Sequence, residues 1–491
     1  MNPFSRLSRV LSFSAWALIA LGLLLRLRQY LANRSLWLDE AMLALNILHK
    51  DVWGLLGRLD YEQGAPVGFL LLEKLVVTLL GDGERALRLL PFLAGCASLI
   101  LFYLLARQFL SPAGLLTALA LLAISPMLVY YASEVKQYSS DVFVALLLLY
   151  LFTRPWSQRL SYGWLVAGLL ASWFSHPAVF VLAAIGLMLL WQHRQRPWPV
   201  LMLGAAWLAS IGLLYLVNLR GLAQNDSLRA YWGEYFHRDP LTALTGLFAN
   251  PAGLTLAPAL LVGMALIGAG FLVFQKTGLH AHSDSPEHAL LQPRNPALVF
   301  LLVFGVTYLA SWLELYPFAR RMILFLVPLV YLLSGAAVDF LWHTPLRLRF
   351  FSRLAAVLLA GFLLYQPLVI STQDFFASVY PEHIRPAVSY LNANYREGDV
   401  VYVYYWAVPA FRYYADPEIP YLAGQRPKDL HILLKELDSL RGQARVWVLF
   451  SHVTDINDHD GLVAHLDTIG QRLDQVVEPL ANVYLYLYDL R

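Results

Sequence analysis

The sequence predicts a mainly α-helical, polytopic membrane protein with a small α/β domain at its C-terminal end. Hydrophobic residues make up 58% of the 491 residues and charged residues only 14%, a composition typical of multi-span membrane proteins. Apolar runs of roughly membrane-spanning length recur as far as Ile370. From Ser371 onward, charged residues become frequent and the apolar runs shorten, which is typical of a soluble domain.

The first apolar run, Leu11–Leu25, follows two arginines within Phe4–Arg9 and therefore resembles a signal anchor with a cytoplasmic N-terminus. The run Val67–Leu80 contains Glu73 and Lys74 and is shorter than a spanning helix, so we expect it to lie in the membrane interface. The remaining predicted spans are Leu89–Ala106, Leu115–Tyr131, Asp141–Phe152, Tyr162–Ser175, Ala178–Gln192, Val200–Val217, Leu254–Phe274, Ala297–Leu313, Met322–Trp342 and Leu354–Ile370.

Basic residues decide the predicted orientation. If Val67–Leu80 does not cross, three basic clusters fall on the cytoplasmic side, as the positive-inside rule requires; if it crosses, all three move outside. These clusters are Arg154/Arg159, His193/Arg194/Arg196 and Arg347/Arg349/Arg353. The non-crossing arrangement predicts about 11 spans in the cytoplasmic (plasma) membrane, with the N-terminus inside and the C-terminus outside.

The predicted domains are a membrane domain over residues 1–370, whose outer loop spans 32–88, and an extracytoplasmic α/β domain over 371–491. Periodicity in the second domain predicts both helices and strands. The expected helices are Pro381–Tyr395, Pro409–Tyr414 and Leu430–Leu440, and the expected strands are Asp399–Tyr405, Arg445–Phe450 and Asn482–Tyr488.

Charge and cysteine content exclude several classes of function. A net charge of +3 gives no electrostatic footprint for nucleic acid. The single cysteine, Cys96, excludes an intrachain disulfide and a cysteine-based zinc site. No run of His, Asp and Glu has metal-ligand spacing, although two acidic loops could still assemble a divalent cation site. The cofactor therefore stays unassigned, with a divalent cation left open.

Polar side chains of both signs gather at the predicted outer membrane edge. Asp39 and Glu40 follow the first span behind Trp37, and the cytoplasmic edges carry only scattered cations. The other members are Glu134, Lys136, Tyr138, Asp141, His176, Glu314, Tyr316, Arg320 and Arg321. Simpler interpretations stay open for some of them. The acidic pair could complement a helix N-terminus, the cations could snorkel to headgroups, and His176 could mark a helix break before Pro177.

Several motifs together resemble a known family. They are Trp37-Leu38-Asp39-Glu40, Pro126 to Tyr138, Gly64 to Leu71, Arg85 to Pro91 and Arg320-Arg321-Met322. In order and spacing they resemble the GT-C type membrane glycosyltransferases that use polyprenyl-phosphate sugars, close to the protein O-mannosyltransferases and the lipid A aminoarabinose transferases. The sequence departs from the family pattern at Ala65, Lys136 and Met322, where the family usually has histidine, arginine and tyrosine.

The resemblance implies transfer of a sugar from a polyprenyl-phosphate donor to a lipid, glycan or protein acceptor at the outer face of the membrane. It implies that Asp39 is the general base of an inverting reaction and that Glu40 orients Asp39 or the acceptor. Lys136, Arg320 and Arg321 would hold the phosphate, with Glu134, Tyr138 and His176 as further substrate-binding residues. The C-terminal domain would cover the site or select the acceptor.

Two other classes of function compete with this interpretation. A transporter or flippase would carry ionisable residues near the middle of its spans and paired broken helices. The predicted span interiors are nearly free of charge, which favours the enzyme. A polysaccharide-assembly scaffold would tolerate Asp39→Asn, whereas the enzyme would not.

Overall fold

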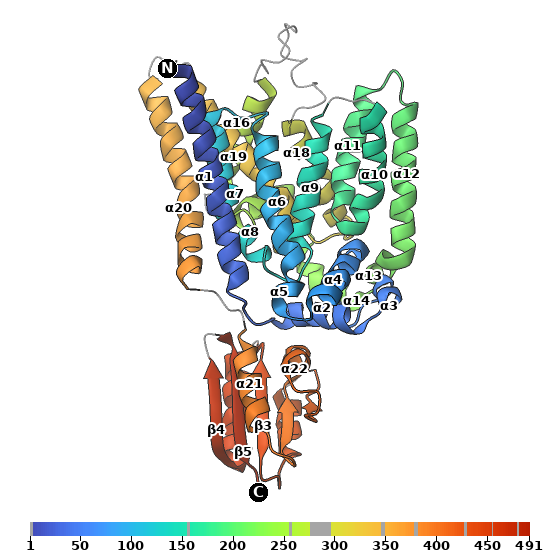
Figure 1. The fold of residues 1–491 in the computed structure, drawn as a ribbon, viewed down its shortest axis with the longest axis vertical. Helices are drawn as coiled ribbons and strands as arrows, with labels where there is room; N and C mark the ends of the chain where they lie inside the picture. The colour runs from blue at the N-terminus through green and yellow to red at the C-terminus, as the bar shows by residue number, and fades with distance from the viewer. Residues whose placement is uncertain are drawn as a thin grey trace. The chain divides into compact units, whose positions relative to one another are not determined.

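The computed structural model describes residues 3–154, 158–254, 258–274, 296–344, 349–377, 382–426, 430–453, 455–478 and 481–491. The chain forms two compact units. Unit 1 comprises Met1–Leu31, Asp51–Gly81 and Arg85–Ala377. Unit 2 comprises Ala32–Lys50, Asp82–Glu84 and Ser378–Arg491. Figure 1 shows unit 1 as a helical bundle and the C-terminal part of unit 2 as a sheet with helices.

Unit 1 is helical, as the sequence predicts. Its helices are α1 (Pro3–Leu31), α3 (Val52–Leu56), α4 (Val67–Leu80), α6 (Leu89–Ala106), α7 (Pro112–Ile124), α8 (Pro126–Tyr131), α9 (Tyr138–Phe152), α10 (Gln158–Phe174), α11 (Ala178–Gln192), α12 (Trp198–Leu214), the π-helical turn η1 (Tyr215–Leu219), α13 (Arg220–Ala223), α14 (Asp226–Trp232), the 3₁₀ turn η2 (Gly233–Tyr235), α15 (Pro240–Ala249), α16 (Pro258–Phe274), α18 (Pro296–Trp312), the 3₁₀ turn η3 (Arg320–Leu326), α19 (Val327–His343) and α20 (Arg349–Phe376). The short helix α5 (Glu84–Leu87) starts in unit 2.

Within the described ranges, five helical stretches are long and apolar enough to cross a membrane, and seven shorter apolar helices accompany them. The five are Leu11–Leu31, Leu89–Ala106, Trp198–Ala223, Arg320–His343 and Arg349–Phe376. This architecture confirms the predicted fold class of a polytopic helical bundle. Part of the predicted span Leu254–Phe274 (residues 255–257) and Pro381 of the predicted helix Pro381–Tyr395 lie outside the described residues.

The predicted single span Leu115–Tyr131 is wrong in one respect, because it is two helices that break between Ile124 and Pro126. Proline has no N–H to donate and disfavours a helical conformation in the residue before it. The carbonyls freed at the break are bonded: Arg26 of α1 donates to the oxygens of Leu122 and Ala123, each at 3.2 Å. Ser371 of α20 donates to the Ile124 oxygen at 2.5 Å. A broken helix inside an apolar bundle needs such partners.

The centre of unit 1 is the apolar stretch Arg320–His343, formed by η3 and α19, in which most residues are buried. It packs against α7, α16 and α20. Gly114 of α7 and Gly335 of α19 bring the two backbones together, since a Cβ on Gly114 would lie 2.4 Å from the Gly335 oxygen. Asp339 of α19 accepts hydrogen bonds from the backbone N–H groups of Ser111 and Gly114, each at 2.7 Å, and so caps α7.

Unit 2 contains a five-stranded mixed sheet in the order β2-β1-β3-β5-β4. β1 runs parallel to β2 and β3, whereas β5 runs antiparallel to β3 and β4. The strands are β1 (Val400–Val403), β2 (Leu422–Ala423), β3 (Val446–Ser451), β4 (Gln471–Glu478) and β5 (Val483–Asp489). The helices are α2 (Leu38–His49), α21 (Ile384–Asn394), the 3₁₀ turn η4 (Tyr405–Ala407), α22 (Val408–Tyr414), α23 (Leu430–Asp438) and α24 (Ile456–Ile469). All six elements predicted within residues 371–491 exist, and β2, β4, α24 and the turn η4 are additional there.

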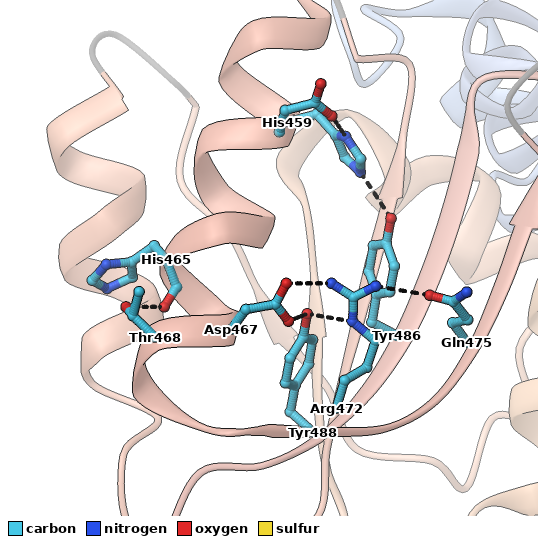
Figure 2. Close-up of polar contacts among 9 residues, drawn as sticks. His459, His465, Asp467, Thr468, Arg472, Gln475, Tyr486 and Tyr488 are labelled. Carbon is cyan, nitrogen blue, oxygen red and sulfur yellow. Dashed lines mark hydrogen bonds and ion pairs between the residues drawn. The ribbon is translucent and has the colours of Figure 1, made fainter.

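Helix α24 and the tyrosines of β5 share a polar network, which Figure 2 shows. Asp467 accepts hydrogen bonds from Arg472 at 2.6 Å and from the Tyr488 hydroxyl at 2.8 Å. Arg472 also donates to Gln475 at 2.9 Å. The ring of His459 lies 4.0 Å from that of Tyr484, centroid to centroid. Two of the alternating tyrosines of β5 thus keep their hydroxyl groups bonded while their rings are buried, Tyr488 to Asp467 and Tyr486 to His459 Nε2 at 3.3 Å.

Candidate active site

The acidic pair lies in the first turn of α2, which begins at Leu38. Glu40 is fully buried, whereas Asp39 is partly exposed. Trp37 precedes the helix but provides no side-chain cap. Instead, the Leu38 N–H donates to Glu382 Oε2 at 3.1 Å, so the helix is capped by a residue 344 positions further along the chain. The pair is therefore at a helix N-terminus, where the helix dipole favours negative charge.

The loop before α2 is held by the C-terminal part of unit 2. The Ser35 hydroxyl bonds to His383 Nδ1 at 2.8 Å, and the Leu36 N–H donates to the Tyr414 hydroxyl at 2.8 Å. Tyr414 in turn donates to Glu84 at 2.9 Å. Arg385 pairs with the same Glu84 carboxylate at 2.5 Å. These contacts make residues 32–50 part of the compact unit that contains the sheet.

Glu382 and His452 form a pair beside the acidic motif. His452 Nδ1 donates to Glu382 Oε1 at 2.5 Å, and the Glu382 side chain is 3% exposed. His452 directly follows β3, and its ring lies 6.4 Å from the Trp37 ring and 6.2 Å from the Trp406 ring. Burial alone would lower the pKa of His452, but the hydrogen bond to Glu382 and the charges of Glu382 and Asp39 outweigh it. The pKa of His452 is therefore raised.

In unit 1, the candidate cations are arranged around the irregular segment between α8 and α9. Lys136 is buried in this segment, and its Nζ donates to Gln63 Oε1 at 2.5 Å. Tyr138 starts α9, and the Arg321 guanidinium lies 5.7 Å from its ring centroid. The structure thus brings Lys136, Tyr138 and Arg321 into one region, with Glu134 fully buried in the same segment. Arg320 is exposed instead, and its backbone has a φ of +40°.

Tyr316 joins this region, since its hydroxyl donates to the Met322 carbonyl at 2.8 Å. Burial raises the pKa of Tyr316, and the charge of Asp141 raises it further. His176 lies in the loop between α10 and α11. Its Nε2 is buried and has no hydrogen-bond partner among the residues that the structure describes.

A small recess in unit 1 adds a feature that the sequence did not predict. Gln63, Gly64 and Ala65 contribute to its wall, and Gln63 is the residue whose Oε1 accepts the hydrogen bond from Lys136 Nζ. The other lining residues are Gly57, Arg58, Leu59, Asn218, Gly221 and Leu222. Asn218 is buried, and its Oδ1 is unbonded within the described ranges.

The predicted site residues are thus divided between the units. Asp39 and Glu40 belong to unit 2, whereas Glu134, Lys136, Tyr138, His176, Arg320 and Arg321 belong to unit 1. Glu382 and His452 were missed, because no local pattern connects them with residues more than 340 positions earlier. Among the described residues, no group of three or more His, Cys, Asp or Glu side chains could hold a metal ion.

Comparisons with known proteins agree with the motifs. Residues 64–218 match the model of the family described as dolichyl-phosphate-mannose-protein mannosyltransferase. No curated protein sequence matches the chain significantly.

Two solved structures are similar to the chain in fold. One is ArnT from Cupriavidus metallidurans bound to undecaprenyl phosphate, with 14% identity and a TM-score of 0.53 over 96% of this chain and 97% of that chain. The other is the archaeal oligosaccharyltransferase AglB from Archaeoglobus fulgidus in complex with an inhibitory peptide and a dolichol-phosphate. It has 11% identity and a TM-score of 0.51 over 96% of this chain and 74% of that chain. The chain therefore has the GT-C fold, and the resemblance that the motifs indicated is confirmed.

Proposed function

We propose that this protein is a glycosyltransferase that moves a sugar from a polyprenyl-phosphate carrier to a lipid, glycan or protein acceptor. The match of residues 64–218 to a family of lipid-phosphate-sugar-dependent transferases carries this proposal. The solved structures of similar fold hold undecaprenyl phosphate and a dolichol-phosphate, which supports a donor of the same class here.

The proposed reaction is a direct displacement at the anomeric carbon of the sugar. The acceptor hydroxyl oxygen forms a bond to this carbon while the bond from the carbon to the phosphate oxygen breaks, so the configuration inverts. Polyprenyl phosphate leaves as an anion, and the hydroxyl proton passes to Asp39 as the general base. Glu40 orients Asp39 or the acceptor. The two acids lie in the first turn of α2, whose dipole favours their ionised form.

The leaving phosphate needs cations or hydrogen-bond donors to stabilise its charge. Lys136 and Arg321 are the proposed phosphate-binding cations. Lys136 lies in the segment between α8 and α9, and the Arg321 guanidinium lies over the ring of Tyr138, the first residue of α9. This placement near one another supports the role. Arg320, Glu134 and His176 remain proposed substrate-binding residues. A lysine at position 136 keeps the charge of the family's arginine but not its bidentate fork.

The proposed location is the cytoplasmic membrane, with a cytoplasmic N-terminus and an extracytoplasmic domain over residues 371–491. Multi-pass placement is supported by the fold and by the apolar helices. The predicted distribution of basic clusters supports the orientation.

A donor screen tests the proposal. Purified protein is incubated with several polyprenyl-phosphate sugars, and release of polyprenyl phosphate is measured with and without candidate acceptors. We expect Asp39→Asn to abolish transfer from the active donor while the variant still inserts into the membrane. Full transfer by Asp39→Asn would contradict the assignment of Asp39 as the general base. Absence of transfer by the wild-type protein from every donor would contradict the proposal that it is a glycosyltransferase.

A further inference from the structure

The first turn of α2 depends on a residue outside the helix. An unpaired N–H at a helix start normally receives a side-chain acceptor, yet Trp37 offers none. Glu382 takes this role through Oε2, which accepts from the Leu38 N–H at 3.1 Å and from the Ser451 hydroxyl at 3.4 Å. Its other oxygen accepts from His452. One buried carboxylate therefore connects α2, the end of β3 and an imidazole.

His452 is held in place by more than its bond to Glu382. Its backbone has a φ of +56°, a left-handed conformation that is strained for a non-glycine residue. The side chain of Asn482 secures the next residue, accepting from the Val453 N–H at 3.1 Å and donating to the Val453 carbonyl at 3.0 Å. Such conformations persist only where the surroundings over-determine them, and they cluster at functional sites.

We propose that Glu382 and His452 are positioning residues for Asp39. Glu382 fixes the first turn of α2 and thereby the direction of the Asp39 side chain. His452, oriented by Glu382, keeps a positive charge near the Asp39 carboxylate. This inference rests on the proposed function, in which Asp39 is the base. A base must be ionised before it can take a proton, and a neighbouring cation favours the ionised form.

The charges around His452 agree with this role. Glu382 and Asp39 both favour the imidazolium, against the effect of burial. Its ring neighbours Trp37 and Trp406 are uncharged, and the Arg426 guanidinium lies 5.5 Å from the Trp406 ring. Because the two carboxylates outweigh burial, the imidazolium persists to a higher pH than in a free histidine. Above that pH, Asp39 loses its nearby cation.

The ionisation of Asp39 can be measured without any sugar donor. Carbodiimide reacts with protonated carboxyl groups, so labelling of Asp39 in the full-length protein is followed against pH by peptide mass spectrometry. We expect His452→Gln to raise the pH at which labelling of Asp39 is half-maximal, the Asp39 midpoint, by about half a pH unit or more. This is the effect of losing one nearby opposite charge. The matched control is His465→Gln, which removes another histidine–carboxylate pair of unit 2, with Asp438 at 3.0 Å. The control should leave the midpoint unchanged.

The capping role is measured by amide hydrogen exchange in the peptide that contains Leu38. We expect Glu382→Ala to speed exchange there about fivefold, because one capping bond contributes about 1 kcal/mol. Glu382→Gln keeps an oxygen acceptor and should preserve protection at Leu38. An unchanged midpoint in His452→Gln, or unchanged exchange in Glu382→Ala, overturns the proposal. Inactivity of the wild-type protein with every donor would instead contradict the proposed function. The Asp39 labelling midpoint and the Leu38 exchange rate would still test the positioning roles.

Discussion

At the scale of single residues, Lys136 is the proposed phosphate-binding cation whose contribution is easiest to test by substitution. It is buried, bonded to Gln63 and located in the segment that matches the family model. We expect Lys136→Met to lower kcat/KM for the donor by about 10²–10³-fold, the typical loss for one donor to a developing anion. Lys136→Arg keeps the charge and should retain most activity.

The control for this prediction is Arg107→Gln, which removes an exposed cation at the end of α6. It should leave kcat/KM unchanged. Initial rates over a range of donor concentrations measure all three variants. A Lys136→Met protein with wild-type kcat/KM would exclude Lys136 from phosphate binding.

A second residue-scale prediction concerns the stability of unit 2. Asp399 has a side chain that is 2% exposed and accepts hydrogen bonds from Arg445 at 2.7 Å and Trp447 at 2.8 Å. Burial alone would raise its pKa, but these bonds, with that of the Arg396 N–H, hold the pKa below the usual value. The folded-state pKa is thus below the unfolded one. Its contribution is therefore present above about pH 4 and is lost as the pH falls through the folded-state pKa.

We expect Asp399→Asn to lower the free energy of unfolding of unit 2 by about 2–3 kcal/mol at pH 7, because Arg445 loses its buried partner. The deficit should shrink as the pH falls below about 4. Thermal unfolding followed by tryptophan fluorescence at several pH values measures both effects. Asp489→Asn, which breaks the pair with the largely exposed Arg491, should change little. A deficit that is independent of pH would contradict the assigned ionisation.

At the scale of elements, the contact of α7 with α19 is a close backbone approach in the core of unit 1. A Cβ on Gly335 would lie 2.5 Å from the Gly114 oxygen, so the side chain of Gly335→Leu would collide with the backbone of α7. We expect this variant to lose thermal stability and to expose α7, because helices in a membrane associate through close packing of small residues. Gly305→Leu on α18, where nothing lies within 4 Å, is the matched control.

Detergent-solubilised protein heated in steps, with the soluble fraction read by size-exclusion chromatography, measures this loss. A Gly335→Leu variant as stable as Gly305→Leu would show that the two helices can separate without cost.

Local sequence patterns predicted most of the helices and strands, but fewer of the contacts between residues that are distant in the sequence. Apolar length alone placed Leu89–Ala106 and Ala178–Gln192 with the bounds that α6 and α11 have. It missed the break before Pro126, because the apolar run continues through it and its stabilising partners, Arg26 and Ser371, lie in other helices. The acidic motif was likewise visible in the sequence. Its partner Glu382 was not, since their contact depends on how unit 2 folds.

At the scale of the whole molecule, the orientation in the membrane is the prediction with the widest consequences. It depends on whether Val67–Leu80, which is helix α4, crosses the membrane. Glu73 and Lys74 in this helix and its length of 14 residues favour an interfacial position, since a spanning helix needs about 20 residues. If α4 does not cross, the clusters at Arg154 and Arg349 are cytoplasmic and the C-terminal part of unit 2 is external.

Reporter fusions measure this directly. Alkaline phosphatase fused after Arg491 should be active, because the enzyme folds only outside the cytoplasm, and a fluorescent protein at the same point should be dark. Fusions within residues 193–196 should give the opposite result and serve as the internal control. An active cytoplasmic reporter after Arg491 would mean that α4 crosses or that one later span does not. That result would move the basic clusters or the C-terminal domain to the other side and remove the argument for an outer-face site, while leaving the contacts within each unit unchanged.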